Sequence, residues 1–307
     1  MAKYAVIDIG TNSVKLSIFT VSGKNLLWEC DKIKISRIGE NVSKTNLLSK
    51  LGMERTIKVF EEWKPLFENV DEVKAVGTMA FRMAKNANIF AKDLKQKFNI
   101  NLEIISGNKE AELSFKAISN SYNFSNLPNL LIDSGGASTE LILFQNNKIL
   151  QKHSYQIGAA SLTEQAILHN PIPKNEIEFA QKVINKELEK QIFTTKINSL
   201  IAIGGTATSL NNLENRLLNK KTNFLNRNNM EYLKNILVNS TIDFRIKELK
   251  IEKGRADILP AGLFILKTLL QKFHQNLEIN YLGLRHGLAL NWMENKTKLK
   301  KMDILKK

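Results

Sequence analysis

The chain has 307 residues, of which 43% are hydrophobic and 24% are charged, an ordinary balance for a globular protein. Its formal net charge of +15 favours polyanionic ligands, unless the abundance of lysine only reflects codon usage. Cys30 is the single cysteine, which excludes an internal disulfide, and no apolar run is long enough to span a bilayer. We therefore expect a cytoplasmic protein with no signal peptide and with enough chain for two domains.

The first part of the chain, residues 1–122, predicts strands that alternate with helices. Two apolar stretches around a short Gly/Ser/Thr loop predict a hairpin, and the apolar stretch that follows predicts a third strand. Apolar residues at helical spacing then predict a long helix, after which shorter strands and helices alternate. The hairpin covers residues 5–19, the other strands 25–31, 73–76 and 102–105, and the helices 47–67, 79–84, 87–98 and 109–121.

The second part of the chain repeats this order of elements. Its hairpin covers residues 130–144, its other strands 148–155, 200–203 and 279–282, and its helices 160–169, 176–192, 229–237, 241–249, 257–273 and 284–294. Residues 210–228 show no clear period. The repeat predicts two α/β domains, residues 1–122 and 123–294, with an interdomain cleft and a hinge over 122–129. We expect a last helix, about residues 295–307, to pack on the first domain.

The two hairpins carry the same residue types in the same register. The matching pairs are Asp8 and Asp133, Gly10 and Gly135, and Ser13 and Ser138. Glycine leaves neighbouring backbone N–H groups accessible, and loops of this kind bind anions, most often phosphate. Hydroxyl groups that can add hydrogen bonds to phosphate belong to Thr11, Ser13, Ser138 and Thr139. The alternative is that the aspartates only cap their turns, where serine and threonine are common as well.

Several charged residues near the predicted strand ends are candidates for chemistry. Asp8 and Asp133 would repel a bound phosphate unless a cation lay between, which implies Mg²⁺ or a similar hard ion. Glu110, in the first turn of a predicted helix, can act as a general base for water, or can simply complement the helix dipole. Glu140 stands where the first hairpin has Lys15.

Three further features have both a functional and a structural interpretation. Arg82 can bind phosphate through two N–H groups, or can be a surface arginine. The run Gly204-Gly205-Thr206 follows a predicted strand, in step with Gly77-Thr78 of the first half. Among the histidines, we expect only His286 to lie near the cleft.

These segments resemble those of the exopolyphosphatase/guanosine pentaphosphate phosphohydrolase (Ppx/GppA) family, within the actin/Hsp70/sugar-kinase superfamily. The resemblance covers nearly the whole chain, and sugar kinases and chaperones lack its combination of Ser-Gly-x-x-Glu-Ala with Arg-Ala-Asp-Ile-Leu-Pro. The segments are AVIDIGTNSVKL (5–16), VGTMAFR (76–82), EIISGNKEAEL (103–113), IDSGGASTEL (132–141), IGGTATSL (203–210), RADILPAGL (255–263) and LGLRHGL (282–288). The implied fold class is α/β, with two duplicated ribonuclease H-like domains of the short two-domain form.

The resemblance implies hydrolysis of the terminal phosphate of polyphosphate or of the 5′ γ-phosphate of guanosine pentaphosphate. It implies Mg²⁺ as cofactor, with K⁺ as a candidate second cation. By position, the implied catalytic residues are Glu110, Asp133 and Glu140, and the implied metal ligands are Asp8 and Asp133. The implied phosphate-binding residues are Gly10, Thr11, Asn12, Ser13, Arg82, Gly135, Gly136, Ala137, Ser138, Thr139, Gly204, Gly205 and Thr206. The expected partners are polyphosphate or guanosine penta- or tetraphosphate and a second copy of the chain, with no specific nucleic acid and no membrane.

The chain departs from the family pattern at a few positions. Ser134 and Ala137 replace an aliphatic residue and a glycine, Lys109 replaces an acid, and His286 replaces a glutamate. A methyl group at Ala137 would clash if the backbone needed a positive φ there. Two alternatives stay open: a phosphotransferase that passes phosphate from polyphosphate to a nucleoside diphosphate, and a non-catalytic sensor of guanosine polyphosphate. The sequence does not separate polyphosphate from guanosine pentaphosphate as substrate.

Overall fold

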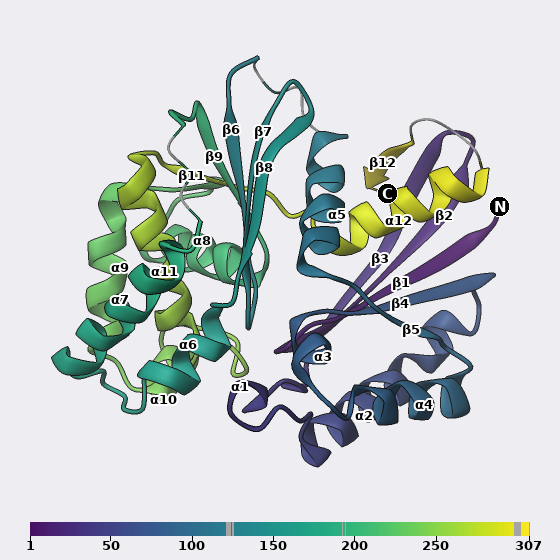
Figure 1. The fold of residues 1–307 in the computed structure, drawn as a ribbon, viewed down its shortest axis with the longest axis horizontal. Helices are drawn as coiled ribbons and strands as arrows, with labels where there is room; N and C mark the ends of the chain where they lie inside the picture. The colour runs from purple at the N-terminus through teal and green to yellow at the C-terminus, as the bar shows by residue number, and fades with distance from the viewer. Residues whose placement is uncertain (121–123, 125, 192, 194, 298–301, 307) are drawn as a thin grey trace. The chain divides into compact units, whose positions relative to one another are not determined.

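The computed structural model describes residues 1–120, 124, 126–191, 193, 195–297 and 302–306 (Figure 1). The chain forms two compact units, unit 1 (residues 1–123 and 282–307) and unit 2 (residues 124–281). The predicted division put residues 282–294 into the second domain, whereas they lie in unit 1. The predicted hinge over 122–129 includes residues 122, 123 and 125, which lie outside the described residues. The hinge and the cleft therefore stay predictions.

Unit 1 is built on a mixed sheet. Its strands are β1 (Lys3–Ile9), β2 (Ser13–Ser22), β3 (Asn25–Ile35), β4 (Glu72–Gly77), β5 (Leu102–Ile104) and β12 (Asp303–Lys306). They lie in the order β12-β3-β2-β1-β4-β5, in which β2 is antiparallel to β1 and to β3, whereas β4 is parallel to β1, β5 to β4 and β12 to β3. Because β1, β4 and β5 are parallel, the loops that follow them start from the same edge of the sheet.

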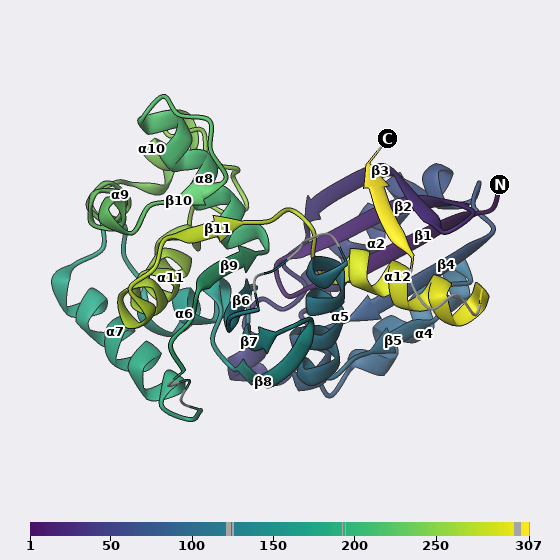
Figure 2. The same cartoon turned by 90° about the horizontal axis from the view of Figure 1, so that it is seen from above.

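Helices cover both faces of this sheet. They are α1 (Val42–Thr45), α2 (Lys50–Phe67), α3 (Met79–Met83), α4 (Ala87–Phe98), α5 (Gly107–Ser119) and α12 (Leu284–Thr297). Alternate residues of a strand point to opposite faces. Ala5 and Ile7 of β1 pack in the core with α2 and α4, whereas Tyr4 and Val6 pack in the core with α5 and α12. Helices α5 and α12 lie together on one face of this sheet (Figures 1 and 2). Asp8 alternates in step with Tyr4 and Val6 along β1, so its carboxylate is expected on that same face.

Unit 2 repeats this architecture. Its strands are β6 (Asn129–Ser134), β7 (Thr139–Gln145), β8 (Lys148–Tyr155), β9 (Ser199–Ile203), β10 (Phe224–Leu225) and β11 (Leu277–Ile279). The strand order is β10-β11-β9-β6-β7-β8. From β8 to β11 this order corresponds to β3-β2-β1-β4-β5 of unit 1, with the same antiparallel and parallel pairs. Strands β10 and β12 are each added at one edge of their sheet. Its helices are α6 (Ala159–Ala166), α7 (Lys174–Leu188), α8 (Gly205–Leu217), α9 (Met230–Val238), α10 (Ile242–Lys247) and α11 (Leu259–Phe273), with the 3-10 turn Arg227–Asn229 before α9.

Two segments differ from the predicted elements. Residues 210–228, which show no clear period, contain the end of α8 and strand β10. The predicted last helix over 295–307 is wrong in part, because α12 ends at Thr297 and Asp303–Lys306 is strand β12; residues 298–301 and 307 are outside the described part. Strand β12 pairs with β3, whose edge would otherwise be open, and Met302 beside it is fully buried. Within the described ranges, no helix is both long and apolar enough to cross a membrane.

Candidate functional site

The two predicted phosphate loops have the same backbone geometry. In unit 1 the Gly10 N–H donates to the Ser13 carbonyl over 3.0 Å, and in unit 2 the Gly135 N–H donates to the Ser138 carbonyl over 2.9 Å. A methyl group at either glycine would lie 3.3 Å from that same carbonyl oxygen. The repeat in the sequence is therefore also a repeat of a tight backbone turn at one edge of each sheet.

The backbone carbonyls of each loop accept hydrogen bonds from another segment of the same unit. In unit 1 the Ser36 and Arg37 N–H groups donate to the Asn12 carbonyl over 3.1 and 3.0 Å, and the Gly39 N–H donates to the Thr11 carbonyl over 3.0 Å. These bonds turn the carbonyls of the loop toward residues 36–39. The loop is thus fixed in place without using the side-chain hydroxyl groups of Thr11 and Ser13 for these contacts.

In unit 2 the first turn of α6 holds the loop. The Ala160 and Ser161 N–H groups donate to the Gly136 carbonyl over 2.7 and 3.0 Å. A methyl group at Gly158 would lie 2.5 Å from the Gly136 carbonyl carbon, so only glycine permits this close approach. The fully buried Thr139 donates its hydroxyl hydrogen to the Ile157 carbonyl over 2.7 Å, so this hydroxyl holds the fold rather than offering a donor to phosphate.

The possible clash at Ala137 does not arise in this structure. Among the described residues, the non-glycine residues with a positive φ do not include Ala137. A methyl group is therefore compatible with the backbone at this position, and the departure from glycine leaves the loop intact. Gly204 does have a positive φ, of 91°, and a methyl group there would lie 3.0 Å from Asp133 Oδ1. The turn before α8 thus lies directly against the Asp133 carboxylate.

The acids beside the two loops have different surroundings. Asp8 pairs in register with Lys15 across β1 and β2, and the Lys15 Nζ lies 3.0 Å from Asp8 Oδ2. At the equivalent position of unit 2, Asp133 pairs in register with Glu140, whose Oε1 accepts a hydrogen bond of 2.7 Å from the Ser154 hydroxyl. Unit 1 therefore places an ammonium group beside its aspartate, where unit 2 places a second carboxylate.

The carboxylates beside the two loops can be compared with what a metal ion needs. Within the described ranges, no group of three or more His, Cys, Asp and Glu side chains could hold a metal. Mg²⁺ nevertheless needs only one or two carboxylates when waters and substrate phosphates complete its octahedron. Asp133 and Glu140 stand opposite each other in register and supply two carboxylates, whereas Asp8 has the Lys15 ammonium beside it.

Arg82 and Glu110 are joined in unit 1. The Arg82 Nη1 donates to Glu110 Oε2 over 2.9 Å and to the Ile105 carbonyl over 2.9 Å. Glu110 lies in the first turn of α5, whose N-terminus is capped by the Ser106 hydroxyl accepting from the Lys109 N–H over 3.2 Å. The Ile105 N–H donates to the Gly77 carbonyl, so the ends of β4 and β5 are adjacent and bring the two side chains together.

Helix α12 fixes the position of α5. The two helices lie side by side in Figures 1 and 2, and a methyl group at Gly287 would lie only 1.7 Å from the Leu113 carbonyl oxygen. Lys116 and Glu294 join the same pair of helices by an ion pair of 2.6 Å. Leu113 is three residues after Glu110 on α5. The packing of α12 against α5 at Leu113 therefore helps to set the position of Glu110.

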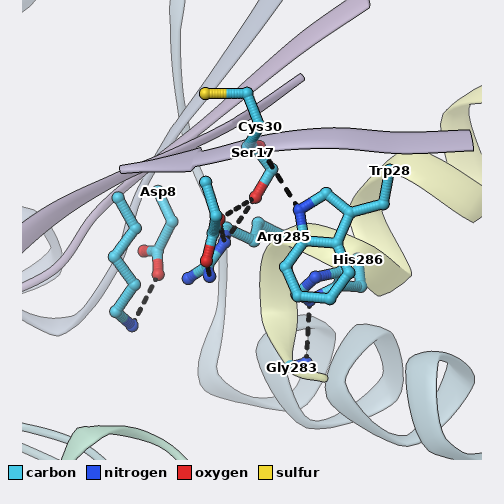
Figure 3. Close-up of polar contacts among 9 residues, drawn as sticks. Asp8, Ser17, Trp28, Cys30, Gly283, Arg285 and His286 are labelled. Atoms are coloured by element: carbon cyan, nitrogen blue, oxygen red, sulfur yellow. Dashed lines mark hydrogen bonds and ion pairs between the residues drawn. The ribbon is translucent and has the colours of Figure 1, made fainter. Parts of the chain in front are cut away.

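Arg285 ties the start of α12 to the sheet of unit 1 (Figure 3). Its Nε lies 2.9 Å from Asp31 Oδ1 and 2.5 Å from the Ser17 hydroxyl, and its Nη2 donates to Asp31 Oδ2. The Ser17 hydroxyl in turn donates to Asp31 Oδ1 over 2.6 Å. The sequence gives no signal for this ion pair, because its partners stand 254 positions apart.

His286 is a buried core residue of unit 1. Its ring packs edge-on against Trp28, with 4.4 Å between ring centroids, and its Nδ1 accepts the Gly283 N–H over 3.1 Å (Figure 3). Burial lowers the pKa of the imidazole well below its ordinary value of 6.5, and the charge of Arg285 lowers it further. His286 is thus a neutral packing residue rather than an exposed titrating one.

This depressed pKa predicts how stability depends on pH. The unfolded chain takes up a proton at His286 below about pH 6.5, whereas the folded state does not until much lower pH, so acid favours unfolding. Below pH 6.5, we expect the free energy of unfolding to fall more steeply with falling pH in the wild type than in His286→Gln. The two slopes should differ by up to about 1.4 kcal/mol per pH unit. Urea unfolding between pH 5 and 7.5 measures the difference, with His153→Gln as control. Parallel curves for wild type and His286→Gln would contradict it.

The fold and the repeated loops together define the class of the protein. Two sheets of the same strand order, each with an acid-and-glycine hairpin, form two ribonuclease H-like domains of the actin-like type. The model of the Ppx/GppA phosphatase family matches residues 21–296, and the chain therefore belongs to this family.

Relatives in this family carry several names. The chain is 29% identical over 295 residues to the bifunctional 3-dehydroquinate synthase/phosphatase of Fusobacterium nucleatum, covering 88% of this chain and 43% of that protein. It is 25% identical to exopolyphosphatase 2 of Mycobacterium tuberculosis, over 95% of this chain and 98% of that protein. It is 26% identical to the guanosine-5'-triphosphate,3'-diphosphate pyrophosphatase of Pseudoalteromonas atlantica, over 95% of this chain and 59% of that protein.

A solved structure gives the same result. The Ppx/GppA family member of Aquifex aeolicus superposes with a TM-score of 0.78 at 27% sequence identity, covering 96% of this chain and 98% of that chain. The family resemblance of the sequence is therefore confirmed over nearly the whole chain.

Proposed function

We propose that this protein hydrolyses the terminal phosphoanhydride bond of linear polyphosphate or of guanosine pentaphosphate. The observation that carries the proposal is the repeated tight turn of the two phosphate loops, each beside an acid at a strand end. Membership of a phosphatase family and a net charge of +15 support a polyanionic substrate.

In the proposed reaction, Glu110 acts as the general base. It takes a proton from a water molecule while the water oxygen bonds to the terminal phosphorus. The bond from that phosphorus to the bridging oxygen breaks, and its electron pair stays on the shortened chain. The products are inorganic phosphate and a chain that is one phosphate shorter. In unit 1, Arg82 and the N–H groups of the loop at residues 10–13 hold phosphate oxygens and stabilise the charge of the transferring group.

Mg²⁺, when bound, would neutralise phosphate charge, and Asp133 with Glu140 would hold it in this proposal. Lys15 supplies a positive charge beside Asp8 in unit 1, where the resemblance implies a second metal ligand. A role for K⁺, the formation of a homodimer and a cytoplasmic location stay predictions from the sequence.

Polyphosphate is the first substrate to test. The alignment with the exopolyphosphatase relative covers 98% of that protein, whereas the alignment with the guanosine pyrophosphatase relative covers only 59% of it. The experiment measures phosphate release from long-chain polyphosphate and from guanosine pentaphosphate, each with Mg²⁺, and compares kcat/KM. We expect release from both, faster from polyphosphate. Absence of release from either substrate would contradict the proposed function.

A further inference from the structure

The guanidinium proposed to bind phosphate and the carboxylate proposed to activate water are bound to each other. The Arg82 Nη1 donates to Glu110 Oε2 and to the Ile105 carbonyl, both over 2.9 Å, and Nη2 lies 3.4 Å from Met79 Sδ. The side chains of Arg82 and Glu110 are only 20% and 11% exposed. Both residues lie in unit 1, so this ion pair is a property of that unit alone.

These contacts engage Nη1 of the Arg82 guanidinium and one oxygen of the Glu110 carboxylate. A guanidinium has five N–H donors, and both hydrogens of Nη1 are directed to acceptors of unit 1. A planar two-point contact with phosphate through Nη1 and Nη2 therefore requires Arg82 to give up a present partner, whereas a phosphate on the edge of Nε and Nη2 would share Arg82 with Glu110. Glu110, for its part, offers one fewer lone pair to a water molecule while Oε2 accepts from Arg82.

The partners of Arg82 differ in how easily they are replaced. The Ile105 carbonyl lies at the end of β5, and its contact is fixed by the backbone. The Glu110 carboxylate is at the end of a side chain and can rotate away. A terminal phosphate carries more negative charge than a carboxylate and binds guanidinium with the same fork geometry. Glu110 is therefore the partner that a phosphate displaces.

We propose that substrate exchanges with Glu110 on Arg82: the terminal phosphate takes the guanidinium, and the released carboxylate becomes available to the attacking water. This inference rests on the proposed function, because it assumes that Arg82 binds the terminal phosphate. The exchange makes the Glu110 carboxylate available as a base only when a phosphate is bound to Arg82. The ion pair seen here is then the resting state of the site.

Binding of a non-hydrolysable probe tests the exchange without turnover. The probe is methylenediphosphonate, whose P–C–P bridge is not hydrolysed, titrated by calorimetry in the presence of Mg²⁺. Glu110→Gln removes the competing charge on Arg82, so we expect this variant to bind the probe about tenfold more tightly than the wild type. Part of that gain would come from lost repulsion between the carboxylate and the probe.

A double-mutant cycle separates the two contributions. In the Arg82→Ala background, Glu110→Gln relieves only the repulsion, and we expect it to tighten binding by less than threefold. Arg82→Gln, which keeps a long polar side chain but carries no charge, takes the place of Arg82→Ala if thermal melting shows that the alanine variant does not fold. Glu112→Gln is the control on the same helix, since Glu112 pairs with Lys109 instead, and it should change binding by less than twofold.

Each outcome decides between the alternatives. Equal or greater tightening in the Arg82→Ala background would mean that Glu110 does not compete with phosphate for Arg82, and would overturn the exchange. Absence of binding by all of the proteins would overturn the exchange together with the phosphate site. The predicted binding pattern without phosphate release from polyphosphate would leave the exchange standing and contradict only the proposed hydrolysis.

Discussion

Glu110→Gln is expected to lower kcat for phosphate release from polyphosphate by at least about 100-fold, because general-base catalysis contributes roughly 10²–10⁴ in rate. Glutamine has the size of glutamate and can still accept a hydrogen bond from Arg82, so the first turn of α5 should keep its geometry. It cannot accept the proton of water. Steady-state phosphate release measures the loss, and thermal melting should show an unchanged fold.

Glu112→Gln is the matched control for this prediction. Glu112 is on the same helix and pairs with Lys109 over 3.8 Å, so its neutralisation changes the charge of the region by the same amount. We expect its kcat to stay within about twofold of the wild type, since a surface ion pair contributes about 0–1 kcal/mol. A loss of kcat that is equal in both variants would mean that charge, rather than proton transfer, explains the effect of Glu110.

Gly287→Ala is expected to have the largest effect on stability. The added methyl group would lie 1.7 Å from the Leu113 carbonyl oxygen, which is backbone and cannot rotate away. Helices α5 and α12 must therefore move apart, and overpacking of this kind costs about 1–3 kcal/mol or more. Because α5 carries Glu110, the proposed base, we also expect kcat to fall by about tenfold to 100-fold in protein that is still folded, since a displacement of about 1 Å can cost about 10²-fold in rate. Urea unfolding and phosphate release measure the two effects.

Asn295→Ala provides the comparison for this variant. Asn295 is exposed near the end of α12, so its replacement removes no packing contact with α5. We expect its free energy of unfolding to stay within about 0.5 kcal/mol of the wild type, as for most surface substitutions. If Gly287→Ala were as stable as Asn295→Ala, the close approach of α12 to α5 would not exist in solution.

Much of the fold could be predicted from local patterns. Strand β8 (Lys148–Tyr155) and helix α4 (Ala87–Phe98) have the predicted bounds, because apolar periodicity is set by neighbours along the chain. Strand β12 could not be predicted in this way. Its four residues form a strand by pairing with β3, which is more than 260 positions earlier, and no local pattern encodes that partner. The return of α12 to unit 1 depends on equally distant contacts.

The candidate site shows the same limit. The two loops could be found because their residues are close in sequence and occur twice, as Gly10 and Gly135 show. The ion pair of Arg82 with Glu110 could not, because its partners lie on different helices and meet only when β4 and β5 are adjacent. The burial of His286 against Trp28 in unit 1 could not be predicted either. Histidine occurs both in functional sites and in buried cores, and the residue type alone does not distinguish the two.

Hydrolysis in ¹⁸O-labelled water tests the central claim most directly. The protein would be incubated with polyphosphate, Mg²⁺ and H₂¹⁸O, with and without a nucleoside diphosphate, and the products would be read by mass spectrometry. If water is the acceptor, as the proposed hydrolysis requires, each released phosphate carries one ¹⁸O atom from solvent, and the nucleoside diphosphate changes neither the label nor the rate. Formation of nucleoside triphosphate in place of labelled phosphate would contradict the account and identify a phosphotransferase. Binding of polyphosphate with neither product would contradict it as well, and would identify a non-catalytic sensor.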